Sequence, residues 1–388
     1  MTTQVLLGAR VFTGERILDG HAVVLEGERI VAVVPRQEAP VGLTPRTLPP
    51  ETLLVPGFID LQVNGAGGVL FNESPTIDAA LSIATTMRRT GTTGLLPTFI
   101  TDAPDLTARA CAAAAEAMAH PGGGVLGIHL EGPFISPERP GVHAPRHIRQ
   151  PEPSDLESLT ALAAHLSHSG GRLLMTLAPE RVDDTFLRRL SDAGAVLFAG
   201  HTMASYERAM ESIAAGVRGF THLFNAMPPV LGRQPGPVQA GFSADEAWCS
   251  VIVDGHHVHP ANLRQLLKAK PPGKVLLVTD AMPPVGTLES TFTLYGLTIL
   301  RRDGRLVTED GTLAGADIDM SAAVRNCLRL LGLPLEEALR MASLYPAQVL
   351  GLEGRLGRLA TGYQADLTLL REDLSVQATW MGGNEQWH

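Results

Sequence analysis

The chain has 388 residues, of which 45% are hydrophobic and 18% are charged, so it can bury a sizeable core and is not a generally disordered protein. Its formal net charge of −9 argues against a general nucleic-acid binder, although a local cationic pocket remains compatible with it. No apolar run reaches the roughly 18 residues that a membrane span needs. We therefore expect one large α/β domain or two domains, with neither nucleic acid nor a membrane as a partner.

Both ends of the chain have the character of short β-strands. Alternating apolar and polar residues over 22–34 are typical of antiparallel strands with one exposed face. The C-terminal stretch 357–372 has the same character. We expect residues 1–55 and 351–388 to pair into one small β domain, with residues 56–350 forming a separate, larger domain.

In that larger domain apolar runs alternate with helix-like segments, which is the order typical of βα units. Helical spacing or alanine-rich composition predicts helices over 77–90, 103–119, 155–169, 183–193 and 205–215. Parallel strands are predicted for the apolar runs 58–63, 94–99, 125–131, 173–178, 196–201, 218–223, 250–254 and 275–280. Eight strands alternating with helices predict an α/β fold of the (β/α)8 TIM-barrel type.

A doubly wound sheet is the alternative to a barrel. The Gly-rich segment 64–68, however, lacks the G-x-G-x-x-G spacing of a dinucleotide-binding turn. After the eighth strand, a polar β-like stretch over 291–307 indicates a hairpin insertion. Helices predicted over 319–331 and 335–342 then lead back to the small β domain.

Residues of metal-ligand type follow several of the predicted strands, where the active site of a barrel is built. Glu131, His201 and His222 end the third, fifth and sixth strands, and a set of two histidines and one carboxylate is typical of catalytic Zn²⁺ sites with an open position. Such a cation lowers the pKa of water to about 7 and polarises a carbonyl oxygen. Asp280 ends the eighth strand, where it can serve as general base and then general acid in amide hydrolysis.

Each of these residues has a simpler interpretation when it is taken alone. A single histidine at a strand end is more commonly a structural residue than a ligand, and an isolated aspartate before a loop is commonly a helix cap. Four such residues on four strands favour a site instead. His129 shares a strand face with Glu131 by the period of two, and we interpret it as a core or supporting histidine.

The cysteines Cys111, Cys249 and Cys327 are far apart and form no C-x-x-C pair, which indicates a reducing compartment rather than a disulfide framework. The N-terminal segment lacks a basic region followed by a sustained apolar run, so we expect no signal peptide. A cytoplasmic protein is therefore expected.

The chain also carries a set of motifs that occur together in one known family. In sequence order they are PGFIDLQVNGAGG, GTTGLLPT, HLEGPFI, AGHT, THLFNAM, DGHHVHP, LVTDAM and GTLAG. The set resembles the N-acetylglucosamine-6-phosphate deacetylases of the amidohydrolase superfamily over nearly the whole chain. This resemblance implies a (β/α)8 barrel with a small β-sandwich made from both termini. It also implies hydrolysis of N-acetyl-D-glucosamine 6-phosphate to glucosamine 6-phosphate and acetate.

The resemblance assigns roles to individual positions. Glu131, His201 and His222 would bind the divalent metal ion. Asp280 would be the catalytic acid and base, and His143 would contact the substrate near its carbonyl as a second catalytic residue. The remaining positions implied to contact the substrate are Gln62, Asn64, Val142, Asn225, Ala226, Arg233, His257, Leu313, Ala314 and Gly315.

Arg233 is the residue implied to meet the phosphate, because the forked donors of a guanidinium match phosphate oxygens. Without the resemblance, an arginine in the Pro-rich loop PPVLGRQPGP would be interpreted as solvent-exposed. The family's pocket is also implied to be completed at its phosphate end across a dimer, so a homodimer is expected.

Two departures from other amidohydrolases limit the expected metal content. Many relatives carry His-x-His on the first strand, where this chain has Gln62 and Asn64. Binuclear relatives also often use a carbamylated lysine on the fourth strand, and this chain has no lysine before Lys268. We therefore expect one divalent metal ion per subunit, Zn²⁺ first, with Fe²⁺, Co²⁺ or Mn²⁺ as alternatives.

Two alternatives to the expected function stay open. N-acetylgalactosamine 6-phosphate differs from the glucosamine substrate in the orientation of one hydroxyl, and the sequence does not separate the two. A non-catalytic sugar-phosphate sensor on the same fold is the other alternative. The presence of all three expected ligands together with Asp280 argues against the sensor.

Overall fold

The computed structural model describes residues 3–388, and an eight-stranded parallel sheet forms the centre of its larger part. The strands neighbour one another in chain order: β8 Phe58–Val63, β11 Thr92–Ile100, β12 Gly127–Glu131, β13 Arg172–Leu177, β14 Val196–Ala199, β15 Val217–Phe220, β16 Trp248–Val251 and β17 Val275–Leu277. A parallel bridge between Val63 and Ala281 joins the first strand to the segment after the last one. The sheet therefore closes into a barrel, and the predicted fold class is confirmed.

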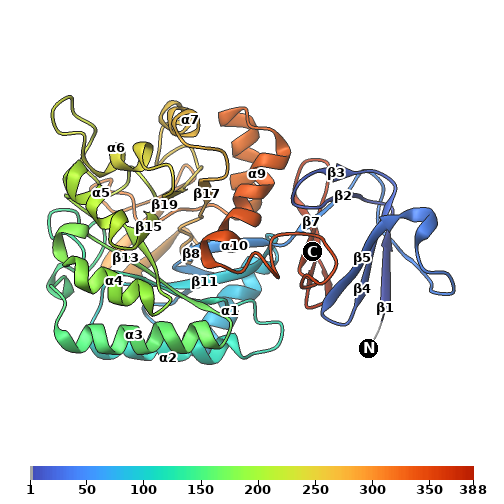
Figure 1. The fold of residues 1–388 in the computed structure, drawn as a ribbon, viewed down its shortest axis with the longest axis horizontal. Coiled ribbons are helices and arrows are strands. Elements are labelled where there is room, and N and C mark those ends of the chain that lie inside the picture. The colour runs from blue at the N-terminus through green and yellow to red at the C-terminus, as the bar shows by residue number, and fades with distance from the viewer. Residues whose placement is uncertain (1–2) are drawn as a thin grey trace.

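Helices between consecutive strands surround this barrel (Figure 1). They are α1 Ile77–Arg88, α2 Pro104–Met118, α3 Pro153–His168, α4 Asp184–Asp192, α5 Tyr206–Ala214, α6 Gly236–Ser243 and α7 Pro260–Ala269. Several begin with a side-chain cap, as when Thr76 accepts the backbone N–H of Ala79 and Ser205 accepts that of Arg208. All five predicted helices are confirmed, whereas α6 and α7 had not been predicted.

The segment after β17 contains the predicted insertion and helices. The insertion is a three-stranded antiparallel sheet rather than a single hairpin, with β18 Thr291–Leu294, β19 Leu297–Arg302 and β20 Arg305–Val307. The two predicted helices are α8 Met320–Asn326, with a π-helical continuation Cys327–Leu331, and α9 Leu335–Ala342; α10 Leu344–Leu350 follows them and is not predicted. None of the helices within residues 3–388 is long and apolar enough to cross a membrane.

Strands from both ends of the chain lie side by side at one end of the molecule, blue and red in Figure 1. One sheet has the order β5 Arg29–Pro35, β4 His21–Glu26, β1 Thr3–Leu7 and β6 Arg46–Thr47. The other has the order β23 Asn384–Trp387, β22 Val376–Met381, β21 Leu367–Leu370, β7 Leu53–Pro56, β2 Arg10–Phe12 and β3 Ile17–Leu18. One apolar cluster that includes Leu25, Leu54, Leu369 and Trp380 draws on both sheets and on both ends of the chain.

Polar side chains fill the barrel below the carboxyl ends of its strands. His129 lies between two threonines, with Nε2 2.8 Å from Thr176 Oγ1 and Nδ1 3.3 Å from Thr98 Oγ1. Thr176 Oγ1 is in turn 2.6 Å from Thr221 Oγ1. Burial lowers the pKa of His129 to about 4, so its imidazole is neutral at pH 7. These bonds connect β11, β12 and β13 with the residue that follows β15, and on β12 they lie two residues before Glu131.

Asp60 is a second buried polar group in the barrel. Its Oδ1 accepts hydrogen bonds from the backbone N–H groups of Gln62 and Thr279, both at 3.2 Å, and its Oδ2 accepts one from the Thr279 hydroxyl at 2.5 Å. Burial raises the pKa of Asp60 to about 7 in spite of these bonds, and the nearby Asp280 carboxylate adds to the increase. The folded protein therefore holds this proton more tightly than the unfolded chain does.

This pKa difference predicts how stability responds to pH. Because the folded pKa lies above the unfolded value, the free energy of unfolding falls as pH rises from about 4 through about 7. Asp60→Asn keeps the acceptor for the backbone donors but carries no titrating proton. Thermal unfolding at pH 5 and pH 8 is expected to show the stability of the variant, relative to wild type, increasing with pH. A difference that stays constant would contradict this assignment, and Asp19→Asn in an exposed turn is the matched control.

Candidate active site

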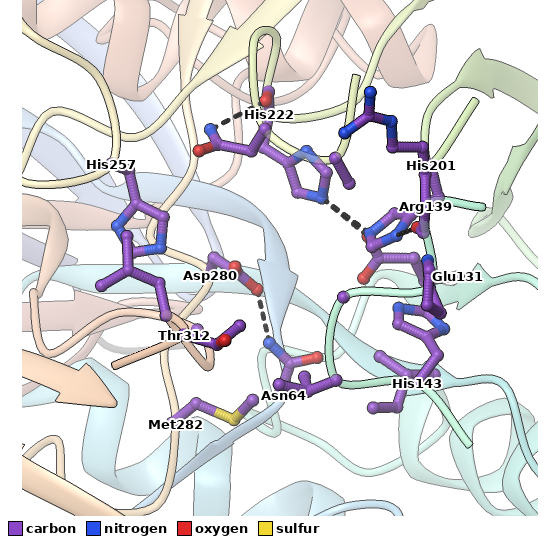
Figure 2. A pocket seen from close by; sticks show the side chains of 18 of the residues that line it. Asn64, Glu131, Arg139, His143, His201, His222, His257, Asp280, Met282 and Thr312 are labelled. Atoms are coloured by element: carbon purple, nitrogen blue, oxygen red, sulfur yellow. Dashed lines mark hydrogen bonds and ion pairs between the residues drawn. The ribbon is translucent and has the colours of Figure 1, made fainter. Parts of the chain in front are cut away.

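The side chains of the site come from the carboxyl ends of the barrel strands. Glu131 is the last residue of β12, while His201, His222 and Asp280 follow β14, β15 and β17 by two or three residues. His257 lies in the loop after β16. Figure 2 shows Glu131 and His201 on one side of the pocket, Asp280 and His257 on the other, and His222 between them.

Three of these residues have a left-handed backbone conformation, which explains why their strands end earlier than predicted. The φ angles are 47° at His201, 30° at His222 and 54° at Asp280. Residues other than glycine adopt this region at a cost of about 1 kcal/mol or more, and such strain concentrates at functional sites. Hydrogen bonds hold it in place: the N–H of Asp280 donates to the Gln62 carbonyl at 3.0 Å, and that of His222 donates to Ser250 Oγ at 2.8 Å.

Glu131, His201 and His222 bring one atom each to a common point. Glu131 Oε1 is 3.1 Å from His201 Nε2 and 2.9 Å from His222 Nε2, and the two nitrogens are 3.2 Å apart. All three side chains are buried. Ligands about 2.0–2.2 Å from a tetrahedral Zn²⁺ lie about 3.3–3.6 Å from one another, so this triangle is close to the size that a cation requires.

The surroundings of the triangle leave His201 and Glu131 in the protonation states that metal ligands need. His201 Nδ1 lies 2.8 Å from the Arg139 carbonyl, which can only accept, so Nδ1 carries the ring proton and Nε2 offers its lone pair. Burial alone would raise the pKa of Glu131, but the adjacent His201 and His222 hold it well below its ordinary value. A buried carboxylate and an imidazole lone pair that face one point fit a divalent cation.

His143 is the other histidine near this point. One of its possible ligand atoms lies within 4.8 Å of those of Glu131 and His201, so these three residues could also hold an ion. His143 Nδ1 is engaged elsewhere, however: it lies 2.9 Å from the Thr101 hydroxyl and accepts the Thr101 backbone N–H at 3.4 Å. The shorter distances of the His222 set therefore make it the better ligand set.

Asp280 faces the triangle from the far side of the barrel. Its Oδ1 accepts hydrogen bonds from Asn64 Nδ2 at 2.6 Å and from Gln62 Nε2 at 3.1 Å, and the Gln62 amide also reaches Glu131 Oε2 at 3.2 Å. Burial, and then the charge of Glu131, raise the pKa of Asp280 to about 6. An acid with this pKa can exchange a proton near neutral pH, which is what general acid–base chemistry requires.

These groups line a cavity of about 330 Å³ that opens at the carboxyl end of the barrel. The lining includes twelve of the residues expected to form the site: Asn64, Glu131, Val142, His143, His201, His222, Asn225, Ala226, His257, Asp280, Leu313 and Gly315. Three others lie elsewhere. Gln62 supports the two carboxylates through hydrogen bonds, Ala314 is fully buried, and Arg233 is exposed on the loop between β15 and α6.

Some residues of the pocket had not been expected. Arg139, Met282 and Thr312 also line it. Thr101, which positions His143, follows directly after β11, so the rule that found the other strand-end residues could have found it too. Arg139 lies on the long loop between Glu131 and His143, where no spacing pattern indicates which side chain turns inward.

Comparisons with known proteins agree with this geometry. A family model described as the Amidohydrolase family matches residues 53–385, and one described as the NagA composite domain matches residues 5–49. The N-acetylgalactosamine-6-phosphate deacetylase of Shewanella sp. (strain ANA-3) is 40% identical over 330 residues, which cover 85% of this chain and 82% of that protein.

Two solved structures have the same fold over almost their whole length. The N-acetylglucosamine-6-phosphate deacetylase from Pasteurella multocida is 34% identical, with a TM-score of 0.94 and coverage of 100% of both chains. A mutant N-acetyl-D-glucosamine-6-phosphate deacetylase from Mycobacterium smegmatis, in complex with N-acetyl-D-glucosamine-6-phosphate, is 32% identical, with a TM-score of 0.90 and coverage of 99% of both chains. The structure has the barrel, a β domain made of strands from both ends of the chain, and candidate metal ligands at the carboxyl ends of the barrel strands. Together with the matches above, these features show that the chain belongs to the amidohydrolase family.

Proposed function

We propose that this protein hydrolyses the acetamide of N-acetyl-D-glucosamine 6-phosphate to glucosamine 6-phosphate and acetate. The observation that carries the proposal is the triangle of Glu131, His201 and His222 opposite Asp280 in one pocket. The two solved relatives named for this deacetylation support the choice of substrate. A divalent cation bound by the triangle would polarise the amide carbonyl and acidify water.

Asp280 is the proposed proton carrier. Gln62 and Asn64 both donate to Oδ1, which holds the carboxylate in place and leaves Oδ2 to exchange the proton. The carboxylate removes a proton from the attacking water. After the tetrahedral intermediate forms, the resulting carboxylic acid returns that proton to the sugar nitrogen, so the departing group leaves as a neutral amine.

His143 is the proposed hydrogen-bond donor to the carbonyl oxygen. Burial, and then the charge of His201, lower the pKa of His143 to about 3, so the ring stays neutral during turnover. Because Nδ1 accepts the Thr101 backbone N–H, the ring proton of this neutral form is on Nε2. That N–H can stabilise the oxyanion as negative charge develops on it.

We also propose the identity and number of the metal ions and the cellular location of the protein. We propose one Zn²⁺ per subunit, since two imidazole nitrogens and one carboxylate suit that ion, with Fe²⁺, Co²⁺ and Mn²⁺ as competitors. Gln62 and Asn64 stand where a second metal would need histidines; the Gln62 amide instead bridges Glu131 and Asp280, and the Asn64 amide donates to Asp280. We propose a cytoplasmic location because Cys111, Cys249 and Cys327 are all free thiols.

The second candidate function is deacetylation of N-acetylgalactosamine 6-phosphate. It is favoured by the Shewanella relative, which carries that name at 40% identity. The values of kcat/KM for acetate release from the two 6-phosphates, measured on one preparation, decide between the candidates. Binding of either sugar phosphate without acetate release would instead favour the non-catalytic sensor.

Asp280→Asn tests the proposed proton transfer. The amide keeps the size and the contacts of the side chain but cannot take a proton from water, so kcat is expected to fall about 10²–10⁴-fold. Acetate release is measured alongside elemental analysis, which should show wild-type metal content. A chelator should abolish the wild-type activity and added Zn²⁺ should restore it. Near wild-type turnover in the variant would refute the role of Asp280.

We also propose that the protein is a homodimer in which Arg233 of one subunit binds the phosphate in the partner's pocket. Arg233 does not line the pocket of its own subunit, and it lies on the loop that exposes Val230 and Leu231. Leu288 and Leu297, on segments after β17, are exposed as well. Large apolar side chains exposed around the pocket end of the barrel support a contact with a second copy.

Mixed dimers test this arrangement. Arg233→Ala alone should raise KM at least tenfold, because a phosphate contact is lost, and Asp280→Asn alone should be nearly inactive. Co-expression with two affinity tags yields heterodimers, in which one pocket has both Asp280 and an arginine from the partner. Activity at the wild-type KM should return in the heterodimer, at no more than half the wild-type kcat. No recovery, or a monomer in sedimentation, would contradict the proposal.

A further inference from the structure

The loop after β16 contains a buried acid–imidazole pair that the proposed mechanism does not use. Asp254 Oδ2 lies 2.6 Å from His257 Nδ1, and the two side chains are only 5% and 6% exposed. Asp254 Oδ1 also accepts the backbone N–H groups of His256 and His257, at 2.8 and 2.9 Å. One carboxylate therefore closes the turn and holds a side chain of that turn at the same time.

This turn sends its two neighbouring histidines in different directions. The ring of His256 approaches the turn between β19 and β20, where its Nε2 lies 3.6 Å from the position that a Cβ on Gly304 would occupy. His257 instead lines the pocket, beside Asp280 (Figure 2). Asn326 Nδ2 donates to the Val253 carbonyl at 2.8 Å and fixes the chain just before the turn.

The pair also determines which ring nitrogen of His257 carries a proton. Burial alone would raise the pKa of Asp254, but hydrogen bonds from His257 and from the backbone lower it to about 2, so the group is a carboxylate at neutral pH. A carboxylate only accepts hydrogen bonds, and at 2.6 Å the Nδ1 atom must therefore be the donor. Nε2 is then the nitrogen that remains for the pocket.

We propose that Asp254 is a positioning residue, which acts through His257 by fixing its orientation and placing a proton on Nδ1, so that Nε2 meets the sugar phosphate. This inference rests on the proposed function for its substrate, but the geometry of the pair does not depend on it. Aspartate partners of this kind orient metal-bound and catalytic histidines, and their loss commonly costs about 10- to 100-fold in affinity or activity.

The first test uses the unmodified protein and no substrate. Two-bond ¹H–¹⁵N correlation spectra of protein labelled with ¹⁵N-histidine, assigned by comparison with His257→Gln, report the protonation of each ring nitrogen. The expected result is a protonated Nδ1 on His257. An unprotonated Nδ1 on His257 would overturn the proposal. This result can be interpreted whether or not the protein proves to be a deacetylase.

The second test is kinetic. Asp254→Asn keeps an acceptor for the turn, but its amide N–H₂ favours a His257 ring with a bare Nδ1. We expect a loss of about 10- to 100-fold in kcat/KM that arises mainly from KM, with unchanged metal content. The double variant Asp254→Asn/His257→Gln should lie within twofold of His257→Gln, because the asparagine keeps the acceptor for the two backbone N–H groups and the proposed effect passes through the His257 ring.

Two outcomes would overturn the kinetic part: an Asp254→Asn protein within twofold of wild type, or a double variant whose loss is the product of the two single losses. Asp183→Asn is the matched control, since Asp183 caps α4 by accepting the Phe186 N–H at 2.8 Å and lies outside the pocket. It should retain the wild-type KM. Absence of acetate release from the wild type would refute the proposed function and leave the spectroscopic test to decide the role of Asp254.

Discussion

The structure of the site depends on the buried carboxylate of Glu131, whose negative charge must be balanced by the groups around it. Glu131 sits at the end of β12 with almost no exposure to solvent, where an isolated charge is expensive. Two imidazole nitrogens lie within 3.1 Å of it, and a divalent cation among the three atoms would compensate its charge. The left-handed backbone at His201 and His222 is the local strain that the barrel tolerates in order to bring both rings to this point.

The hydrogen-bond partners of the site residues give its two carboxylates, Glu131 and Asp280, different surroundings. On one side, the Arg139 carbonyl fixes the His201 tautomer, so that the Nε2 lone pair faces the point that a cation would occupy. On the other side, the Gln62 and Asn64 amides hold Asp280 and carry no positive charge of their own. Burial and then the charge of Glu131 raise the pKa of Asp280 to about 6, while His201 and His222 hold the pKa of Glu131 well below its ordinary value. Separated pKa values of this kind are what allow one carboxylate to bind metal and another to move protons.

Much of this could be predicted from the sequence, because apolar runs mark the strands and parallel strands bring their carboxyl ends together. That rule alone selects Glu131, His201, His222 and Asp280, and the family motifs add the loop residues. Arg233 shows where the prediction stops: a loop residue can be identified by its motif, but whether it turns into its own pocket or away from it depends on tertiary packing. α6 was missed because it begins with Gly-Pro and lacks a strong apolar period.

Anomalous X-ray diffraction at the absorption edge of zinc, from crystals of protein purified with Zn²⁺, tests most directly whether the triangle of Glu131, His201 and His222 binds one metal ion. We expect a single anomalous peak per subunit, bound by Glu131 and by the Nε2 atoms of His201 and His222. Two peaks in one pocket, or one peak bound by His143 in place of His222, would contradict it.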